Sequence, residues 1–403
     1  MCEIMTFFEQ KHKIVHINLN EKIVRHHKME KRIFLSSPTM HDEEMNFIQE
    51  AFDRNWVAPL GFNCDGFESE MVEYLSYNNE KYYAVALASG TAAIHLAIVL
   101  AGVKDGDTVF CSDLTFAATV NPVSYVGAKQ VFIDSEEETW NMCPVALEKA
   151  FQKYPGTKVV IVAHLYGTPA KMDEILEVCT RHNAILIEDA AEALSAEYKG
   201  KKCGTFGEYN ILSFNGNKII TTSGGGMLLT KDRDLRDKAL KLATQSREKA
   251  LWYQHEEIGY NYRMSNIVAG IGRGQLIHVE EHRDLKEKIY NRYKDAFEGY
   301  KVTMNPFLEC SKPNFWLSCI LLDKDSKADP IEICKKLDEE NIEARPIWKP
   351  MHMQPVFAGY DCISIGEKNV GEDIFARGLC LPSDIKMTED EQDEVIRIIK
   401  SML

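Results

Sequence analysis

Lys218 lies in a segment whose composition favours a chemically active amine. Residues 213–226 read Ser-Phe-Asn-Gly-Asn-Lys-Ile-Ile-Thr-Thr-Ser-Gly-Gly-Gly, so the lysine stands between a short apolar strand and a glycine run. Such surroundings withdraw the amine from water, and desolvation favours the neutral form, which can attack an aldehyde. A lysine on a solvated loop is the alternative interpretation of this segment taken alone.

A second chemical feature lies upstream, where an apolar run at 184–187 is followed by Glu188, Asp189 and Glu192. This pattern predicts a buried strand that ends in carboxylates, at the edge where open parallel sheets bind their ligands. Together with the lysine, the aspartate indicates pyridoxal 5'-phosphate (PLP), whose ring nitrogen needs an anionic partner and whose aldehyde needs an amine. We therefore expect PLP to bind at Asp189 and Lys218.

The elements that must position these residues alternate regularly along the chain. Strands are predicted at 82–88, 108–111, 130–133, 158–163, 184–187, 210–213 and 227–230, and helices at 40–55, 92–101, 116–126, 144–154, 171–182 and 232–241. This rhythm predicts an α/β fold with a mainly parallel sheet and helices on both faces.

The later part of the chain predicts a smaller α+β domain. A long helical region at 264–290 is followed by a strand at 316–322 and by helices at 330–340 and 389–402. We place a large PLP-binding domain at 32–280 and a small C-terminal domain at 281–403. Residues 1–31 form an N-terminal extension to which we assign no function.

Composition limits the possible partners and sites. A formal net charge of −14 over 403 residues argues against nucleic-acid binding, which normally requires a basic face. No segment reaches the roughly 18 consecutive apolar residues that cross a bilayer, so we expect no membrane insertion. The 11 cysteines show no paired CxxC spacing and indicate reduced thiols of a cytoplasmic protein without a metal site.

Four segments, in this order, resemble the DegT/DnrJ/EryC1/StrS sugar aminotransferases. They are Ser-Gly-Thr-Ala-Ala at 89–93, Glu-Asp-Ala-Ala-Glu at 188–192, Ser-Phe-Asn-Gly-Asn-Lys at 213–218 and Gly-Tyr-Asn-Tyr-Arg-Met at 259–264. The resemblance runs from about Ile33 to the C-terminus. It implies a type I PLP-dependent transferase fold, in which Lys218 bonds the cofactor and moves a proton and Asp189 pairs with the ring nitrogen.

The resemblance also implies the remaining cofactor contacts. Phe116 matches the aromatic residue that stacks on the cofactor ring, and Thr91, Ala92 and Ser213 match the phosphate contacts. The helix predicted to start near 92 supports this, because free backbone N–H groups and the helix dipole favour an anion there. Asn261 matches a side chain that reaches the phosphate from the other subunit, which implies a homodimer with shared active sites.

Glu192 departs from the commoner family pattern, which has glutamine or histidine at this position. A donor there would hydrogen-bond the ring oxygen of the cofactor, whereas an ionised glutamate would place two like charges together. Glu192 therefore either holds a proton or is displaced. Some N-acetyl-sugar C4 enzymes of the family share this glutamate.

Further segments are most similar to family members that aminate a UDP-4-keto-6-deoxy-N-acetylhexosamine at C4, of the bacillosamine-pathway type. These segments are 58–61, 164–167 and 345–352. The similarity implies a UDP-linked ketosugar and glutamate as substrates, for bacterial glycan synthesis. Arg263, Arg345 and His352 are candidates for binding the nucleotide diphosphate, since arginine suits phosphate. A surface or ion-paired position is the alternative for each.

Other functions compatible with this fold remain as alternatives. The enzyme could aminate another nucleotide ketosugar, at C3 or linked to dTDP. A dehydratase of the family would carry histidine in place of Lys218, and a non-catalytic regulatory protein would be expected to lose Lys218 or Asp189. A nicotinamide-dependent oxidoreductase would need Gly-x-Gly-x-x-Gly after the first strand, whereas residues 224–226 precede a strand.

Overall fold

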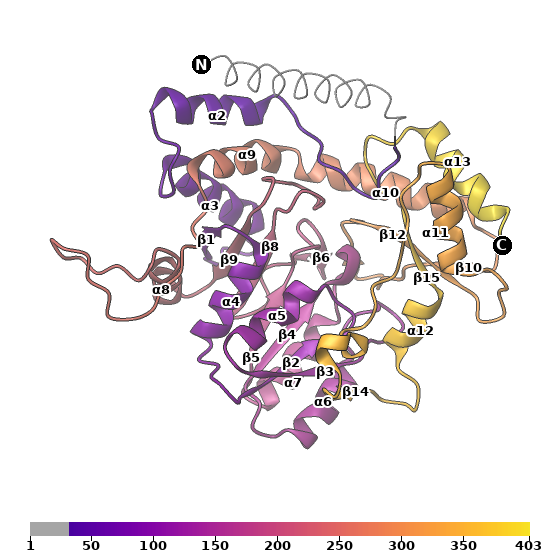
Figure 1. Cartoon of the computed structure of the whole chain (residues 1–403), viewed down its shortest axis with the longest axis horizontal. Coiled ribbons are helices and arrows are strands. Elements are labelled where there is room, and N and C mark those ends of the chain that lie inside the picture. The colour runs from indigo at the N-terminus through magenta and orange to yellow at the C-terminus, as the bar shows by residue number, and fades with distance from the viewer. Residues whose placement is uncertain (1–31) are drawn as a thin grey trace, which may run out of the picture.

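The computed structural model describes residues 32–403, so the extension predicted at 1–31 lies outside the described residues. Its centre is an eight-stranded sheet in the order β1-β9-β8-β5-β4-β2-β3-β14 (Figure 1). Every neighbouring pair from β8 to β14 is parallel, and β9 is antiparallel to both of its neighbours. The predicted mainly parallel sheet is thus confirmed. The strands are β1 (Tyr83–Leu87), β2 (Thr108–Ser112), β3 (Lys129–Ile133), β4 (Val159–Ala163), β5 (Ile185–Asp189), β8 (Tyr209–Ser213), β9 (Gly226–Thr230) and β14 (Cys362–Ile363).

Helices cover both faces of this sheet, because successive strand residues point to opposite sides. In β2, Val109 and Cys111 pack into one apolar cluster and Phe110 into another. The first face carries α4 (Gly90–Leu100), α5 (Ala117–Tyr125) and α8 (Arg233–Ala243). The second carries α3 (Phe62–Leu75), α6 (Pro144–Lys153), α7 (Met172–Arg181) and α9 (Asn266–Ile277).

Two of these helical regions differ from the sequence prediction. The region predicted at 264–290 is two helices, α9 and α10 (Val279–Ala296), which meet at His278. Helix α3 was not predicted, although its buried Cys64, Phe67, Met71 and Leu75 recur every three or four residues. Helix α2 (Glu43–Asp53) packs against α9 where Gly274 leaves room, since a Cβ there would lie 2.6 Å from the backbone nitrogen of Glu44.

A second, antiparallel sheet has the order β10-β12-β15-β13. Its strands are β10 (Val302–Met304), β12 (Ser318–Leu322), β13 (Arg345–Pro346) and β15 (Gly378–Leu381). Apolar residues of α10, α11 (Pro330–Glu339) and α13 (Glu389–Lys400) pack on it, and α12 (Val370–Arg377) leads into β15. Strand β14 comes from the same C-terminal part of the chain but joins the large sheet beside β3. Among residues 32–403, no helix is both long and apolar enough to span a membrane.

Asn314 fastens the C-terminal part of the chain to the loop after β5. Its side-chain amide donates to the carbonyl oxygens of Glu192 (2.7 Å) and Leu194 (2.8 Å), and its Oδ1 accepts a hydrogen bond from the Trp316 N–H (2.9 Å). The residue is completely buried. Gly167 lies against it with a φ of +88°, and a Cβ there would be 1.7 Å from Asn314 Oδ1. This clip fixes Glu192 and Trp316 relative to one another.

We expect Asn314→Ala to lower the free energy of unfolding by about 2–5 kcal/mol, because each buried polar group left unpaired costs about 1–3 kcal/mol. Denaturant unfolding followed by circular dichroism would measure the loss. Asn291→Ala, at an exposed position of α10, is the matched control and should change stability little. Equal losses for the two variants would contradict the role of Asn314 as a clip.

Candidate active site

The candidate site is a cavity of about 720 Å³ at the carboxyl edge of the large sheet. Strands β1, β4, β5 and β8 run in the same direction, so the residues at or just after their ends meet there. The cavity size is typical of a small-molecule site. Of the residues predicted from the sequence, those that line it are Thr91, Phe116, Asp189, Glu192, Ser213, Lys218 and Arg345.

Asp189 is the last residue of β5, which extends beyond the strand predicted at 184–187. Its Oδ2 accepts a hydrogen bond from the Thr119 hydroxyl (2.7 Å) and its Oδ1 from the Ala191 N–H (3.1 Å). Burial raises the pKa of the carboxyl above its usual range, while the Thr119 hydrogen bond opposes that rise. Because both donors are neutral groups, this buried carboxylate suits a cationic partner such as a protonated pyridine nitrogen.

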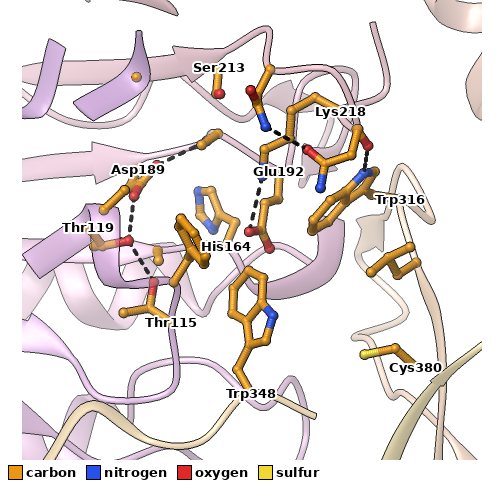
Figure 2. A pocket seen from close by; sticks show the side chains of 18 of the residues that line it. Thr115, Thr119, His164, Asp189, Glu192, Ser213, Lys218, Trp316, Trp348 and Cys380 are labelled. Atoms are coloured by element: carbon orange, nitrogen blue, oxygen red, sulfur yellow. Dashed lines mark hydrogen bonds and ion pairs between the residues drawn. The ribbon is translucent and has the colours of Figure 1, made fainter. Parts of the chain in front are cut away.

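Glu192 and Lys218 lie side by side in the cavity wall and form an ion pair (Figure 2), with 3.4 Å between Glu192 Oε1 and Lys218 Nζ. Glu192 Oε2 accepts a hydrogen bond from the Tyr166 N–H at 2.7 Å, so a proton on this carboxyl must sit on Oε1. Burial raises the Glu192 pKa to about 6, and the Lys218 charge opposes the rise. The glutamate is therefore not displaced: it lines the cavity and is 8% exposed.

The start of α4 forms a candidate anion cradle beside these groups. Ser89 caps the helix, accepting a hydrogen bond from the Ala92 N–H at 3.0 Å, while Gly90 and Thr91 line the cavity. N–H groups in a first helical turn have no partner within the helix. The start of α4 packs closely against Gly226, where a Cβ would lie 2.3 Å from the Gly90 nitrogen, so only glycine allows this packing. The cradle, Asp189 and Lys218 together fit the phosphate, ring nitrogen and aldehyde of PLP.

Phe116 stands at the cavity with 56% of its surface exposed, and its ring centroid lies 5.4 Å from that of Trp348. Ala92 is buried and does not line the cavity, and its N–H donates to the Ser89 side chain. Asn261 is exposed on the surface outside the cavity of its own chain.

Two predicted substrate contacts do not reach the cavity. Arg263 is 7% exposed, pairs with Glu68 and donates to the carbonyl of Ala86 (2.9 Å). His352 pairs with Asp113 (2.6 Å) and Glu372 (3.0 Å), and these partners raise its pKa to about 9. Arg263 and His352 are therefore each paired with a carboxylate of the same chain.

Arg345 does line the cavity, but its guanidinium is paired with a carboxylate as well. Glu343 Oε1 lies 3.3 Å from the Arg345 side chain, and Glu343 Oε2 accepts a hydrogen bond from the Leu35 N–H. The sequence shows arginine and histidine as candidate cations, but it does not show which carboxylates fold against them.

The sequence analysis missed several residues of the cavity wall. His164 lies there with its Nε2 2.9 Å from Glu188 and its Nδ1 accepting the Ala170 N–H (3.0 Å). Other missed wall residues are Thr119, Trp316, Trp348 and Lys349. The segments 164–167 and 345–352, already notable for their similarity to C4 aminotransferases, were the available signal for three of these residues.

Known structures place this fold among the PLP-dependent aminotransferases. A DegT/DnrJ/EryC1/StrS aminotransferase from Brucella abortus superposes with a TM-score of 0.80 at 26% identity, covering 89% of this chain and 95% of that one. The PLP form of Spr1654 from Streptococcus pneumoniae has the same fold, with a TM-score of 0.83 at 22% identity over 93% of this chain and all of that one. The chain is thus an α/β protein of the type I PLP-dependent class, and PLP is its cofactor.

The chain belongs to the DegT/DnrJ/EryC1/StrS aminotransferase family, which matches it over residues 38–400. It is 49% identical to the Bacillus subtilis protein EpsN, named as a PLP-dependent aminotransferase, over 92% of this chain and 96% of that protein. It is 36% identical to the GDP-perosamine synthase of Caulobacter vibrioides over 92% of this chain and 98% of that enzyme. The family expected from the sequence motifs is confirmed.

We expect Glu192→Gln to keep most of the activity and Glu192→Ala to be slower by roughly one to two orders of magnitude, the effect of one strong hydrogen bond. The glutamine amide can donate toward the cofactor oxygen at any pH, while its own oxygen accepts the Tyr166 N–H. In the wild type, the proton is lost as pH rises through about 6, so the ratio of glutamine-variant to wild-type turnover should rise there.

Steady-state turnover of the three proteins across this pH range tests the expectation, with thermal melting as the check on folding. A glutamine variant as impaired as the alanine variant would show that the carboxylate charge itself is required.

Proposed function

We propose that this enzyme transfers an amino group from glutamate to the C4 keto group of a UDP-4-keto-6-deoxy-N-acetylhexosamine, giving a UDP-4-amino sugar for glycan synthesis. The observation that carries the proposal is the arrangement of Lys218, Glu192 and Asp189 around one cavity. An amino transfer through PLP needs an amine that bonds the cofactor and a carboxylate that pairs with its ring nitrogen, and Glu192 adds a candidate donor to the ring oxygen, where the commoner family pattern has glutamine or histidine.

Bound PLP supplies an aldehyde that accepts the amino group and a ring that withdraws electrons from the reacting carbon. The side chains divide the remaining work. Asp189 keeps the ring nitrogen protonated, and Glu192 donates to the ring oxygen. Lys218 would bond the cofactor and would also carry a proton to and from the reacting carbon of the substrate.

Lys349 is our candidate for the cation that binds the nucleotide diphosphate. It lines the cavity and is half-buried, and its amine has no ion pair or hydrogen bond with residues 32–403. Arg345, by contrast, already faces Glu343. An unpaired ammonium in a protein of net charge −14 offers a phosphate a partner that no internal carboxylate occupies.

Three observations bear on the identity of the sugar. One relative, from Saccharopolyspora spinosa, is named dTDP-4-dehydro-2,3,6-trideoxy-D-glucose 4-aminotransferase and is 28% identical to this chain, which supports amination at C4. Glu192 supports an N-acetylated substrate, since some N-acetyl-sugar enzymes share it. The GDP-perosamine synthases among the relatives favour a GDP-linked ketosugar as the second candidate.

Purified enzyme incubated with glutamate and a panel of UDP-, GDP- and dTDP-linked 4-ketosugars should give its highest kcat/KM with UDP-4-keto-6-deoxy-N-acetylhexosamine. Lys218→Ala should abolish turnover and also the borohydride-stable bond that mass spectrometry detects on the Lys218 peptide.

Lys349→Met should raise KM for the sugar nucleotide about 10-fold or more while leaving KM for glutamate unchanged, as expected for loss of a charged contact.

Preference for a GDP-linked sugar would overturn the substrate while leaving the amino transfer intact. A borohydride-stable adduct on a different lysine would overturn the site. Lys349→Arg is the matched control, because it retains the positive charge and should restore most of the affinity.

We also propose a homodimer in which each subunit completes the other's site. Asn261 lies outside the cavity of its own chain, and the segment after α8 projects from the body of the molecule (Figure 1). Large apolar side chains are exposed on this segment: Leu251 is fully exposed, and Trp252, Tyr253 and Ile258 are 65%, 77% and 86% exposed. Apolar surface of this kind marks a protein contact.

Mixing Lys218→Ala with Asn261→Ala subunits should restore part of the activity, because one site of each mixed dimer then keeps both residues. The assay follows turnover after subunit exchange, and differently tagged subunits verify that mixed dimers have formed. Absence of recovery in verified mixed dimers, with both parent variants impaired, would contradict a shared site.

A further inference from the structure

Trp316 touches Lys218 in two independent ways. Its indole N–H donates to the carbonyl oxygen of Asn217, the residue before the lysine, at 2.6 Å. Its ring face lies under the amine, with Lys218 Nζ 4.1 Å from the ring centroid. Figure 2 shows the indole and Glu192 on different sides of the lysine side chain. The amine is therefore confined between a carboxylate and an aromatic face.

The indole itself is rigidly held. Trp316 is 2% exposed, and its backbone N–H donates to Asn314 Oδ1 at 2.9 Å. Its carbonyl accepts a hydrogen bond from the buried amine of Lys286 at 3.1 Å, which also donates to Ser383. Phe315, just before it, has a φ of +53°, in the left-handed region that side chains rarely adopt. Such a conformation persists only where the surroundings impose it.

The backbone of Lys218 has local support, since its N–H donates to the Asn215 carbonyl at 3.0 Å and Ile219 after it is buried. Its side-chain amine, however, is held by Glu192 and Trp316 from other segments. Lys218 lies in a bend between β8 and β9, outside any helix or strand. Gly216, two residues before it, adds no packing, since a Cβ there would meet only the carbonyl of Ser223 at 3.8 Å. A long side chain on such a bend loses much conformational freedom when its amine is held in one place. The necessary restraint must come from another part of the chain.

We propose that Trp316 is a positioning residue for the reaction: its N–H fixes the backbone beside Lys218, and its ring face holds the free amine where the proton must be exchanged. This inference rests on the proposed role of Lys218 as the lysine that bonds PLP. An ammonium over an indole face is attracted by the ring quadrupole, and tryptophan gives the strongest such attraction. Glu192 and Trp316 would together restrict the amine to one position.

Two substitutions separate the two contacts. Trp316→Phe keeps an aromatic face but removes the N–H, and should slow the half-reaction with glutamate about 3- to 10-fold, the effect of one hydrogen bond. Trp316→Leu removes both contacts and should slow it about 10- to 100-fold. The change in cofactor absorbance after mixing holoenzyme with glutamate, without ketosugar, measures this rate.

A second measurement does not depend on activity. In holoenzyme held with glutamate, the Lys218 amine is free, and its acetylation by acetic anhydride can be followed by mass spectrometry. A less restrained amine is more accessible, so labelling should become faster in both variants, and about 3-fold faster or more in Trp316→Leu, which loses the attraction of the aromatic face. Slower chemistry combined with faster labelling is the signature of a lysine that has lost its position.

Trp140→Phe is the matched control, since Trp140 is a 3% exposed tryptophan of the same apolar cluster but does not line the cavity. It should leave both rates unchanged. Normal half-reaction rates in both Trp316 variants, with only KM for the sugar nucleotide raised, would overturn the inference and make Trp316 a sugar contact. Slowed chemistry with unchanged labelling would overturn it too. Failure of the function proposal is distinguishable, because the wild type itself would then show no adduct on Lys218.

Discussion

The burial of two carboxylates, Asp189 and Glu192, in one loop at the end of β5 imposes the main constraint on this structure. Burial raises the pKa of both groups, so each needs a proton, a cation or several donors nearby. Glu192 faces Lys218 and accepts the Tyr166 N–H, whereas Asp189 has only a hydroxyl and a backbone N–H. The two carboxylates thus have different hydrogen-bond and ion-pair partners, and this difference is consistent with the different roles that we propose for them.

The same constraint explains how cations are distributed. The protein carries an excess of acidic groups, and Arg263, Arg345 and His352 each pair with a carboxylate of their own chain. Breaking a buried pair leaves an uncompensated charge, so Arg263 and His352 are not free to bind a ligand at low cost, whereas Arg345 is exposed and its pair with Glu343 is weak. A substrate anion is better served by a cation that the fold leaves unpaired, and Lys349 meets that description within residues 32–403.

Sequence patterns predicted those parts of the site that depend on neighbours in the chain. Lys218 and Asp189 stand out because strand ends and glycine runs are local signals, and the strand–helix rhythm defined the sheet for the same reason. Trp316 and Asn314 were not predictable in this way, since their importance comes from contacts with residues about a hundred positions away. The ion-pair partner of each arginine and histidine could not be predicted either, because partners such as Glu68 are brought close by tertiary packing.

Strand β14 lies at the edge of the large sheet but comes late in the sequence. Residues 362–363 complete the edge of a sheet whose other strands have all been made by residue 230, so this edge stays open until residues 231–361 have also been synthesised. An open edge strand can pair with other chains, and pairings between distant segments form slowly. The edge of β3 is therefore available for pairing with other chains from the time this strand is made until β14 has been added.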